Sequence, residues 1–367
     1  MRWELLLGLA LLTTGIAGCI GTDGPADDTA TTASLGDLDL PAKVHDLLPV
    51  EIEWIETTSD GKAMHTAVYR PDTDDPVGVF INFSPYWGDT AEQRGDNFAQ
   101  YMIDEYVPRG FAVVLAAIRG TGHSEGCFQI AGDQELQDMH DVIDHFADVP
   151  WSNGNVAAGG KSYDSTPQNG LIAKNPHEAL KGIFHVSGIT DMYRYNYRQG
   201  VTYAHGTAFN TYYYLQGTDE YGASFLSTPT VENTMSEDPE SLSRILDDAA
   251  CTELPQMQAS GIGSGIHGMK DAYWIERDWN RYIADTDWNG SIFFVHGLQD
   301  WNVKPDHILP WLQLLPEQIP VKGWLHQDTE NNGHVYPMRA DWNQTMLTWL
   351  HHTLNGADVP IDWTVQA

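Results

Sequence analysis

The chain has 367 residues, 42% of them hydrophobic, which is enough to bury a large core. Its 51 acidic residues against 19 lysines and arginines give a formal net charge of −32, and a surface this acidic repels nucleic acid and anionic lipid, so neither is an expected partner. Molar salt relieves the self-repulsion, because the Debye length there is about 3 Å, so we expect a halophilic protein rather than an ordinary acidic extracellular one.

The first 48 residues predict export followed by a tether. The apolar run Leu5–Leu12 is too short to span a bilayer but suits a signal peptide over residues 1–18. Ile-Ala-Gly-Cys, ending at Cys19, resembles a lipobox, in which cleavage leaves the cysteine lipid-modified; plain secretion with an incidental cysteine is the alternative. Residues 19–48 then form a flexible, lipid-anchored tether, so we expect membrane contact only through the lipid.

Residues 49–190 predict the first part of an α/β core. Alternating apolar residues between 51 and 69 indicate a hairpin, and continuous apolar runs at 77–83 and 111–118 indicate strands buried on both faces of a parallel sheet. After Asp133, the spacing of four apolar residues places them on one face of a helix: Leu136, Met139, Ile143 and Phe146. Alternating strands and helices predict a doubly wound, mostly parallel sheet.

Ser162 carries the strongest chemical signal. Gly-Lys-Ser-Tyr-Asp-Ser at 160–165 follows an apolar run and precedes a segment able to form a helix, which is the form of a nucleophile elbow. A serine nucleophile needs a base and an acid that orients the base. Asp300 follows the apolar run 292–295, and His334 lies in the loop after residues 322–325. The order Ser, Asp, His is that of α/β-hydrolases, so we predict these three as the catalytic residues.

Their competitors are less well placed. His326 lies too near the end of its predicted strand, and Asp328 comes from the wrong connection. We expect Arg119 to be a buried arginine that ties loops together, although a substrate contact is the alternative, and we expect His296 to be a core histidine. His351 and His352 belong to the last predicted helix and are not expected to be ligands, and the chain shows no other pattern of a metal or cofactor site.

Residues 191–279 lack a continuous strand pattern and predict a helical cap insertion, with a helix after Asp238; residues 280–367 complete the core. The cap's tyrosines suit a wall facing the substrate, but packing inside the insertion explains them equally well. Because an export route permits disulfides, we expect Cys127 and Cys251 to pair and to join the cap to the core; two free thiols are the alternative.

Five motifs in order resemble the bacterial Xaa-Pro dipeptidyl-peptidases, which group with cocaine-esterase-like acyl hydrolases of the CocE/NonD type. They lie at 84–86, 119–126, 160–163, 296–303 and 333–334, within a resemblance that covers roughly residues 50 to 355. The resemblance implies an α/β-hydrolase fold with a cap. It also implies that the Tyr86 hydroxyl joins the backbone N–H of Tyr163 in the oxyanion hole.

The chain departs from the family pattern in several places. Ser165 stands where the family usually has glycine, Asp164 where an apolar residue is common, and Ala117 where esterase-like members often carry Asp. The family usually continues into a C-terminal β-sandwich, whereas this chain stops at Ala367, so we expect contacts made by that sandwich to be missing.

The resemblance implies a peptide or a small ester or amide as substrate. In the peptidase branch an apolar aromatic pocket takes proline and an acid holds the free amine. Five residues are candidates for this pocket: Trp301, Val303, Tyr193, Tyr197 and Gln199. The motif around Asp300 favours release of Xaa-Pro dipeptides. Gln199 or its neighbour replaces the expected glutamate, which weakens an ammonium contact and keeps a carboxylesterase or amidase as the alternative. A lipoprotein that binds without cleaving is a third, remote class.

Overall fold

The computed structural model describes residues 42–86, 97–203, 268–327, 333–334, 336–337 and 339–366. A nine-stranded sheet in the order β1-β2-β4-β3-β5-β6-β9-β10-β11 forms its centre. The strands are β1 (Glu51–Glu56), β2 (Ala63–Tyr69), β3 (Val77–Ser84), β4 (Phe111–Ala117), β5 (Ser152–Lys161), β6 (Leu180–Val186), β9 (Ser291–Gly297), β10 (Val321–His326) and β11 (Val365–Gln366). The predicted α/β-hydrolase fold is confirmed.

The direction of the strands determines where catalytic side chains can come together. β1 and β2 form the predicted antiparallel hairpin, and β2 also runs antiparallel to β4. From β4 to β10 every neighbouring pair is parallel. The carboxyl ends of β3, β5, β9 and β10 therefore share one edge of the sheet, which is where ligands bind in open α/β sheets.

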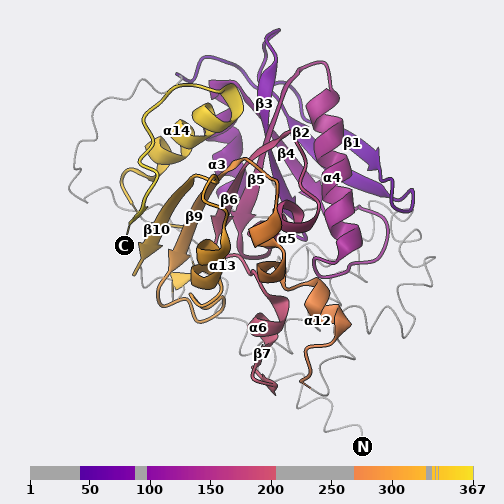
Figure 1. Ribbon diagram of the computed structural model, residues 1–367. Coiled ribbons are helices and arrows are strands. Elements are labelled where there is room, and N and C mark those ends of the chain that lie inside the picture. The colour runs from indigo at the N-terminus through magenta and orange to yellow at the C-terminus, as the bar shows by residue number, and fades with distance from the viewer. Residues whose placement is uncertain are drawn as a thin grey trace, which may run out of the picture.

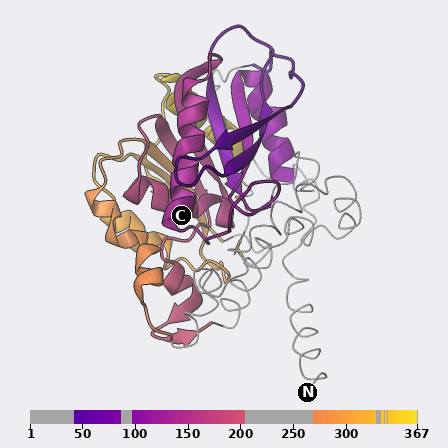
Figure 2. The same ribbon diagram turned by 90° about the vertical axis from the view of Figure 1, so that its right-hand side faces the viewer.

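Helices cover both faces of the sheet (Figures 1 and 2). One core cluster lies between the sheet and α4 (Asp133–Asp148), α5 (Pro167–Lys174) and α13 (Ile308–Leu314). A second lies between the opposite face and α3 (Asn97–Tyr106) with α14 (Trp342–Asn355). The four apolar residues predicted on one face of α4 are all buried. His351 and His352 lie on α14 as expected.

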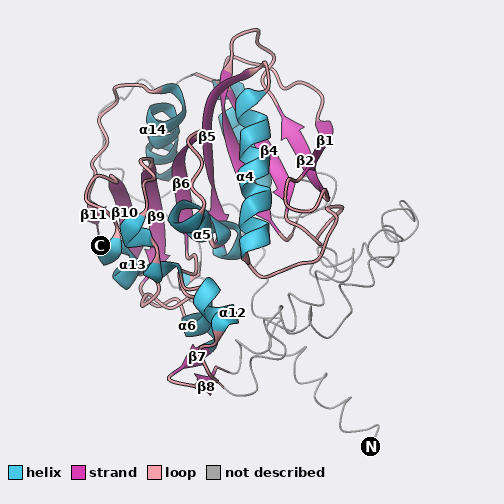
Figure 3. Ribbon diagram, turned by 45° about the vertical axis from the view of Figure 1, so that its right-hand side comes forward, coloured by secondary structure: helices cyan, strands magenta, loops and turns pink. Residues whose placement is uncertain are grey.

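The described parts of the predicted cap lie together beyond the carboxyl edge of the sheet (Figure 3). They are α6 (Met192–Asn196), a ribbon of β7 (Tyr197–Arg198) and β8 (Val201–Thr202), and α12 (Ala272–Glu276). Among the described residues there are also four 3₁₀ turns: η1 (Val107–Arg109), η2 (Ser162–Ser165), η5 (Trp279–Arg281) and η6 (Ile283–Asp285). The helix predicted after Asp238 lies outside the described residues, as do the predicted signal peptide and most of the tether. None of the helices described is long and apolar enough to cross a membrane.

Candidate active site

Ser162 lies where β5 meets η2 and α5, so the strand, turn and helix of the predicted elbow are present. Its backbone has φ of 63°, a left-handed conformation that residues other than glycine rarely adopt. Surrounding bonds hold this conformation, because the Thr166 hydroxyl donates to the Ser162 carbonyl at 2.8 Å and accepts the N–H of Ile189 at 3.0 Å. The turn therefore places Ser162 at the carboxyl end of β5.

The elbow also explains how Ser165 replaces the family's glycine. The Ser165 hydroxyl is buried within hydrogen-bonding distance of two carbonyls, those of Ser162 at 3.0 Å and Val186 at 2.9 Å. A Cβ added to Gly188 would lie 2.6 Å from this hydroxyl. Glycine at 188 therefore leaves the room that a serine at 165 needs. Asp164 is buried as well.

Asp300 follows β9 and has no exposed side-chain surface. One carboxylate oxygen accepts the N–H groups of Asn302 and Val303, both at 2.9 Å, and the other lies 2.8 Å from Nδ1 of His334. Burial raises the pKa of the Asp300 carboxyl, but the hydrogen bond and charge of His334, together with His296 and the Val303 N–H, hold the pKa below its ordinary value. A carboxylate fixed in this way orients the imidazole.

Two glycines allow the histidine segment to approach Asp300. Gly333 has φ of 85°, and a Cβ added to Gly297 would lie 2.8 Å from the Gly333 Cα and closer still to its carbonyl oxygen. A Cβ added to Gly333 would in turn lie 3.0 Å from the Asp300 N. Both positions need glycine because backbone meets backbone here.

The predicted oxyanion donors occupy the same edge of the sheet. Tyr86 follows β3, the neighbour of β5, and its N–H donates to the Ser84 hydroxyl at 3.1 Å. Tyr163 directly follows the nucleophile, and its side chain is buried. The sheet thus brings Ser162, Asp300, His334 and both tyrosines to one edge.

The candidate pocket residues have different environments. Trp301 is 41% exposed beside Asp300, whereas Val303 is fully buried in the core. Tyr193 and Tyr197 stack with ring centroids 5.0 Å apart, and both pack edge-on against Trp274. These contacts favour the second interpretation of the tyrosines, namely packing within the cap.

Gln199 lies with Gly200 at the tip of the β7–β8 ribbon, where both residues have positive φ. The Gln199 side chain is exposed there. A two-residue turn of this kind accounts for a Gln-Gly pair without any substrate contact.

The structure adds a contact that holds the Asp300 loop and that the sequence alone did not reveal. The Tyr195 hydroxyl donates to the Asn302 side-chain oxygen at 2.8 Å, which ties the cap base to this loop. His296, predicted as a core histidine, is fully buried, and its Nε2 lies 2.8 Å from the Val303 carbonyl, which confirms that prediction. The tyrosine-rich segment before residue 200 was the available signal, but only the fold shows which tyrosine reaches the loop.

The expectations for Arg119 and for the cysteines meet different outcomes. Arg119 is buried and pairs with Asp138 and Asp60, which confirms its predicted structural role. Cys127 takes part in a disulfide, whereas Cys251 and Cys19 lie outside the described residues, so the Cys127–Cys251 pairing and the lipid site stay predictions. Within the described ranges, no group of three His, Cys, Asp or Glu side chains is placed to hold a metal ion.

Comparisons with known proteins identify relatives of this chain. The chain is 30% identical to a protein of Bacillus cereus and 27% identical to one of Streptomyces avermitilis, both provisionally named Xaa-Pro dipeptidyl-peptidase. In each comparison 85% of this chain is matched, to 54% of the Bacillus protein and to 47% of the Streptomyces protein. The chain thus spans about half the length of these relatives.

Solved structures share the fold. A CocE/NonD family hydrolase from Staphylococcus aureus matches 86% of this chain and 52% of its own, with a TM-score of 0.60 at 18% identity. An α-amino acid ester hydrolase matches 92% of this chain and 59% of its own, with a TM-score of 0.61 at 17% identity. The model of the X-Pro dipeptidyl-peptidase (S15) family matches residues 60–332, which are most of the chain, so this protein belongs to the S15 peptidase family.

Proposed function

We propose that this protein is a serine hydrolase that works through an acyl-enzyme, with Ser162 as nucleophile, His334 as base and Asp300 as the acid that orients the base. The observation that carries the proposal is the 2.8 Å contact between His334 Nδ1 and a buried Asp300 carboxylate, at the same sheet edge as the strained Ser162. With Nδ1–H held by Asp300, Nε2 of His334 is free to accept the serine proton.

The oxyanion of the tetrahedral intermediate needs donors that are already in place. We assign the backbone N–H of Tyr163 and the hydroxyl of Tyr86 to this role. Support comes from their position beside Ser162, on the turn after β5 and after the adjacent strand β3. His334 then protonates the leaving group, and water repeats the attack on the acyl-enzyme.

The substrate that we propose is the N-terminal Xaa-Pro dipeptide of a peptide. The family to which the chain belongs supports this choice. A carboxylesterase or amidase is the second candidate, and a specific observation favours it: residues 193–200 contain no acidic side chain to hold a substrate amine, and Gln199 lies at an exposed turn. A carboxylate would be needed for a charge-assisted contact with an ammonium group.

Labelling with a fluorophosphonate probe tests the nucleophile. The wild-type protein should react at molar salt, and Ser162→Ala should neither react nor turn over substrate above background. Ser152→Ala, at the opposite end of β5, is the matched control and should behave like the wild type. Labelling that persists in Ser162→Ala rejects the assignment.

A substrate panel separates the two candidates. Ala-Pro anilide, its N-blocked form and a simple aryl ester are compared at molar salt. A dipeptidyl-peptidase cleaves the free anilide and not the blocked one, because the ammonium group must be held. Cleavage of the ester and the blocked anilide, with the free anilide untouched, moves the protein to the esterase branch.

We also propose that the enzyme acts outside the cell, anchored by a lipid on Cys19. The lipobox-like Ile-Ala-Gly-Cys and the polar segment after it support this proposal. Expression in a host that lipidates exported proteins should put the wild type in the detergent phase of a Triton X-114 partition and Cys19→Ser in the aqueous phase. Equal partition of the two proteins rejects the anchor.

A further inference from the structure

The side chain of Tyr163 leads away from the nucleophile into the protein interior. It is 2% exposed, and its hydroxyl lies 3.0 Å and 3.2 Å from the two carboxyl oxygens of Glu135. Since the proposed oxyanion donor is the backbone N–H of this same residue, the side chain acts as an anchor for the donor. The contact of the hydroxyl with Glu135 is therefore one of the contacts that fix this residue.

Glu135 lies in the first turn of α4 and has no exposed surface. Its Oε2 accepts the N–H of Ala131 at 2.9 Å. Ala131 and Ile130 both have φ near 55°, a conformation that persists only where the surroundings enforce it. Glu135 is thus fixed from the loop before its helix as well as by the helix itself.

The loop is held in turn from the cap side of the molecule. Arg277, which follows α12 and is buried, donates to the carbonyls of Ile130 at 3.0 Å and Gln129 at 2.9 Å. Its guanidinium also lies 3.8 Å from the ring centre of Tyr273. A continuous set of contacts therefore runs from the base of the cap to Tyr163.

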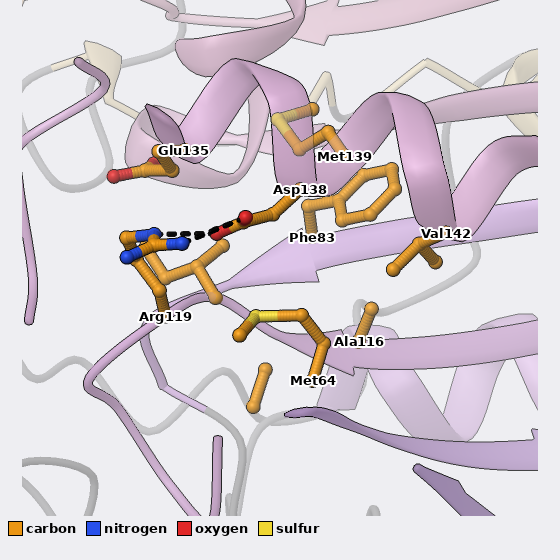
Figure 4. A pocket seen from close by; sticks show the side chains of 10 residues that line it. Met64, Phe83, Ala116, Arg119, Glu135, Asp138, Met139 and Val142 are labelled. Atoms are coloured by element: carbon orange, nitrogen blue, oxygen red, sulfur yellow. Dashed lines mark hydrogen bonds and ion pairs between the residues drawn. The ribbon is translucent and has the colours of Figure 1, made fainter. Parts of the chain in front are cut away.

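The nearby Arg119 cluster forms its hydrogen bonds with partners other than Glu135. Figure 4 shows Glu135 at the polar end of a small cavity, close to the Arg119–Asp138 pair, while Met139 and Val142 line the apolar end. Arg119 donates to Asp138 at 2.5 Å and 2.8 Å. Because the arginine's bonds go to Asp138 and Asp60, Glu135 remains available to Tyr163.

We propose that Glu135 is a positioning residue: it holds the Tyr163 hydroxyl so that the Tyr163 N–H points at the developing oxyanion. This inference rests on the proposed serine hydrolase function. Burying a carboxyl group is costly unless its hydrogen bonds are made, and an apolar residue would fill the same space without that cost. Its hydrogen bond to Tyr163, which carries the oxyanion donor, explains why a carboxyl group rather than an apolar group is buried here.

The test uses Tyr163→Phe, Glu135→Leu, Glu135→Gln and the double variant Tyr163→Phe/Glu135→Leu. Turnover of an aryl ester gives kcat and KM, and inhibition by a phenylboronic acid reports on binding of a tetrahedral adduct. Removing either partner should lower kcat and boronate affinity about tenfold with KM nearly unchanged, because only the transition state uses the donor.

Three further comparisons sharpen the test. The double variant should be no worse than either single one, since both remove the same contact. Glu135→Gln should recover to within about twofold, because an amide can accept from Ala131 and donate to the tyrosine oxygen. Asp60→Asn, which alters the neighbouring Arg119 cluster without touching Tyr163, is the matched control and should keep the wild-type kcat.

The outcomes separate the two proposals. A wild-type protein that neither reacts with fluorophosphonate nor hydrolyses any of the panel substrates overturns the proposed function. A reactive wild type with unchanged kcat and boronate affinity in Tyr163→Phe overturns the role of Glu135 alone. A lower melting temperature with intact kcat in Glu135→Leu has the same meaning. If Glu135→Leu fails to fold, Tyr163→Phe and Glu135→Gln still decide.

Discussion

Gly297→Ala tests whether the close approach of the His334 segment to Asp300 is required. The new Cβ would lie 2.8 Å from the Gly333 Cα, where carbon atoms need about 3.5 Å or more, and closer still to the carbonyl oxygen. The segment must therefore retreat by about 1 Å. The 2.8 Å contact between His334 and Asp300 would then exceed hydrogen-bonding distance.

A displacement of about 1 Å in a catalytic group costs on the order of 100-fold in rate, which is about 2.7 kcal/mol of transition-state stabilisation. We expect kcat/KM of Gly297→Ala to fall by at least this factor. The assay is hydrolysis of the best panel substrate at molar salt, beside the rate of fluorophosphonate labelling and a thermal melt.

Gly356→Ala is the control, because Gly356 has φ of 64° and nothing within 4 Å of an added Cβ. It should lower stability by about 1 kcal/mol through backbone strain and leave kcat/KM unchanged. A Gly297→Ala protein with wild-type kcat/KM would refute the argument that the two glycines bring the histidine to the acid.

Four further predictions follow from the same geometry. Asp300→Asn should keep the backbone bonds of its loop but present an N–H to His334, which favours the wrong tautomer and lowers kcat about 10⁴-fold; a loss under tenfold contradicts this. Tyr86→Phe should lower kcat by about 10²–10³ with little change in KM, and an unchanged kcat places the second donor elsewhere. Activity and melting temperature should rise from 0.1 M to molar salt, since 19 basic residues face 51 acidic ones; equal stability at both salt concentrations argues against the halophilic interpretation. Burial lowers the pKa of His185 from 6.5 to about 3. The wild type should therefore lose stability relative to His185→Phe as pH falls below 6.5, by about 2 kcal/mol at pH 5. Urea melts in which the two proteins differ in unfolding free energy by the same amount at pH 7.5 and at pH 5 contradict this.

The central strands were predictable because a parallel sheet covered on both faces reads as continuous apolar runs. Strand pairing that depends on residues far away in the chain was not predictable. The polar start of β5, Ser152–Asn155, lies in the strand although its side chains carry no strand pattern. β11 has two residues and exists through its pairing with β10. Local sequence does not encode such contacts.

The catalytic residues of the candidate site were predictable for the same reason as the central strands. Ser162, Asp300 and His334 each follow a strand that its own sequence reveals, and parallel topology then brings the strand ends to one edge. The pocket was not predictable in this way. Tyr193 and Tyr197 face Trp274, which is distant in the chain, and the Gln-Gly pair at 199–200 forms a turn whose geometry competes with a role in substrate binding.

The distribution of positive charge links the fold to the salt dependence. The scarce basic residues include several whose side chains are withdrawn from solvent: Arg119, Arg277 and Lys322 are 1%, 3% and 5% exposed. Arg119 and Arg277 hold the loops around α4, and Lys270 joins Asp191 to Asp278 at the cap base. Cations held inside the fold are not available to pair with carboxylates at the surface. Dissolved salt screens exposed charges strongly and buried pairs weakly. Molar salt should therefore relieve the repulsion at the surface while the interior contacts that position Tyr163 and the Asp300 loop keep their geometry.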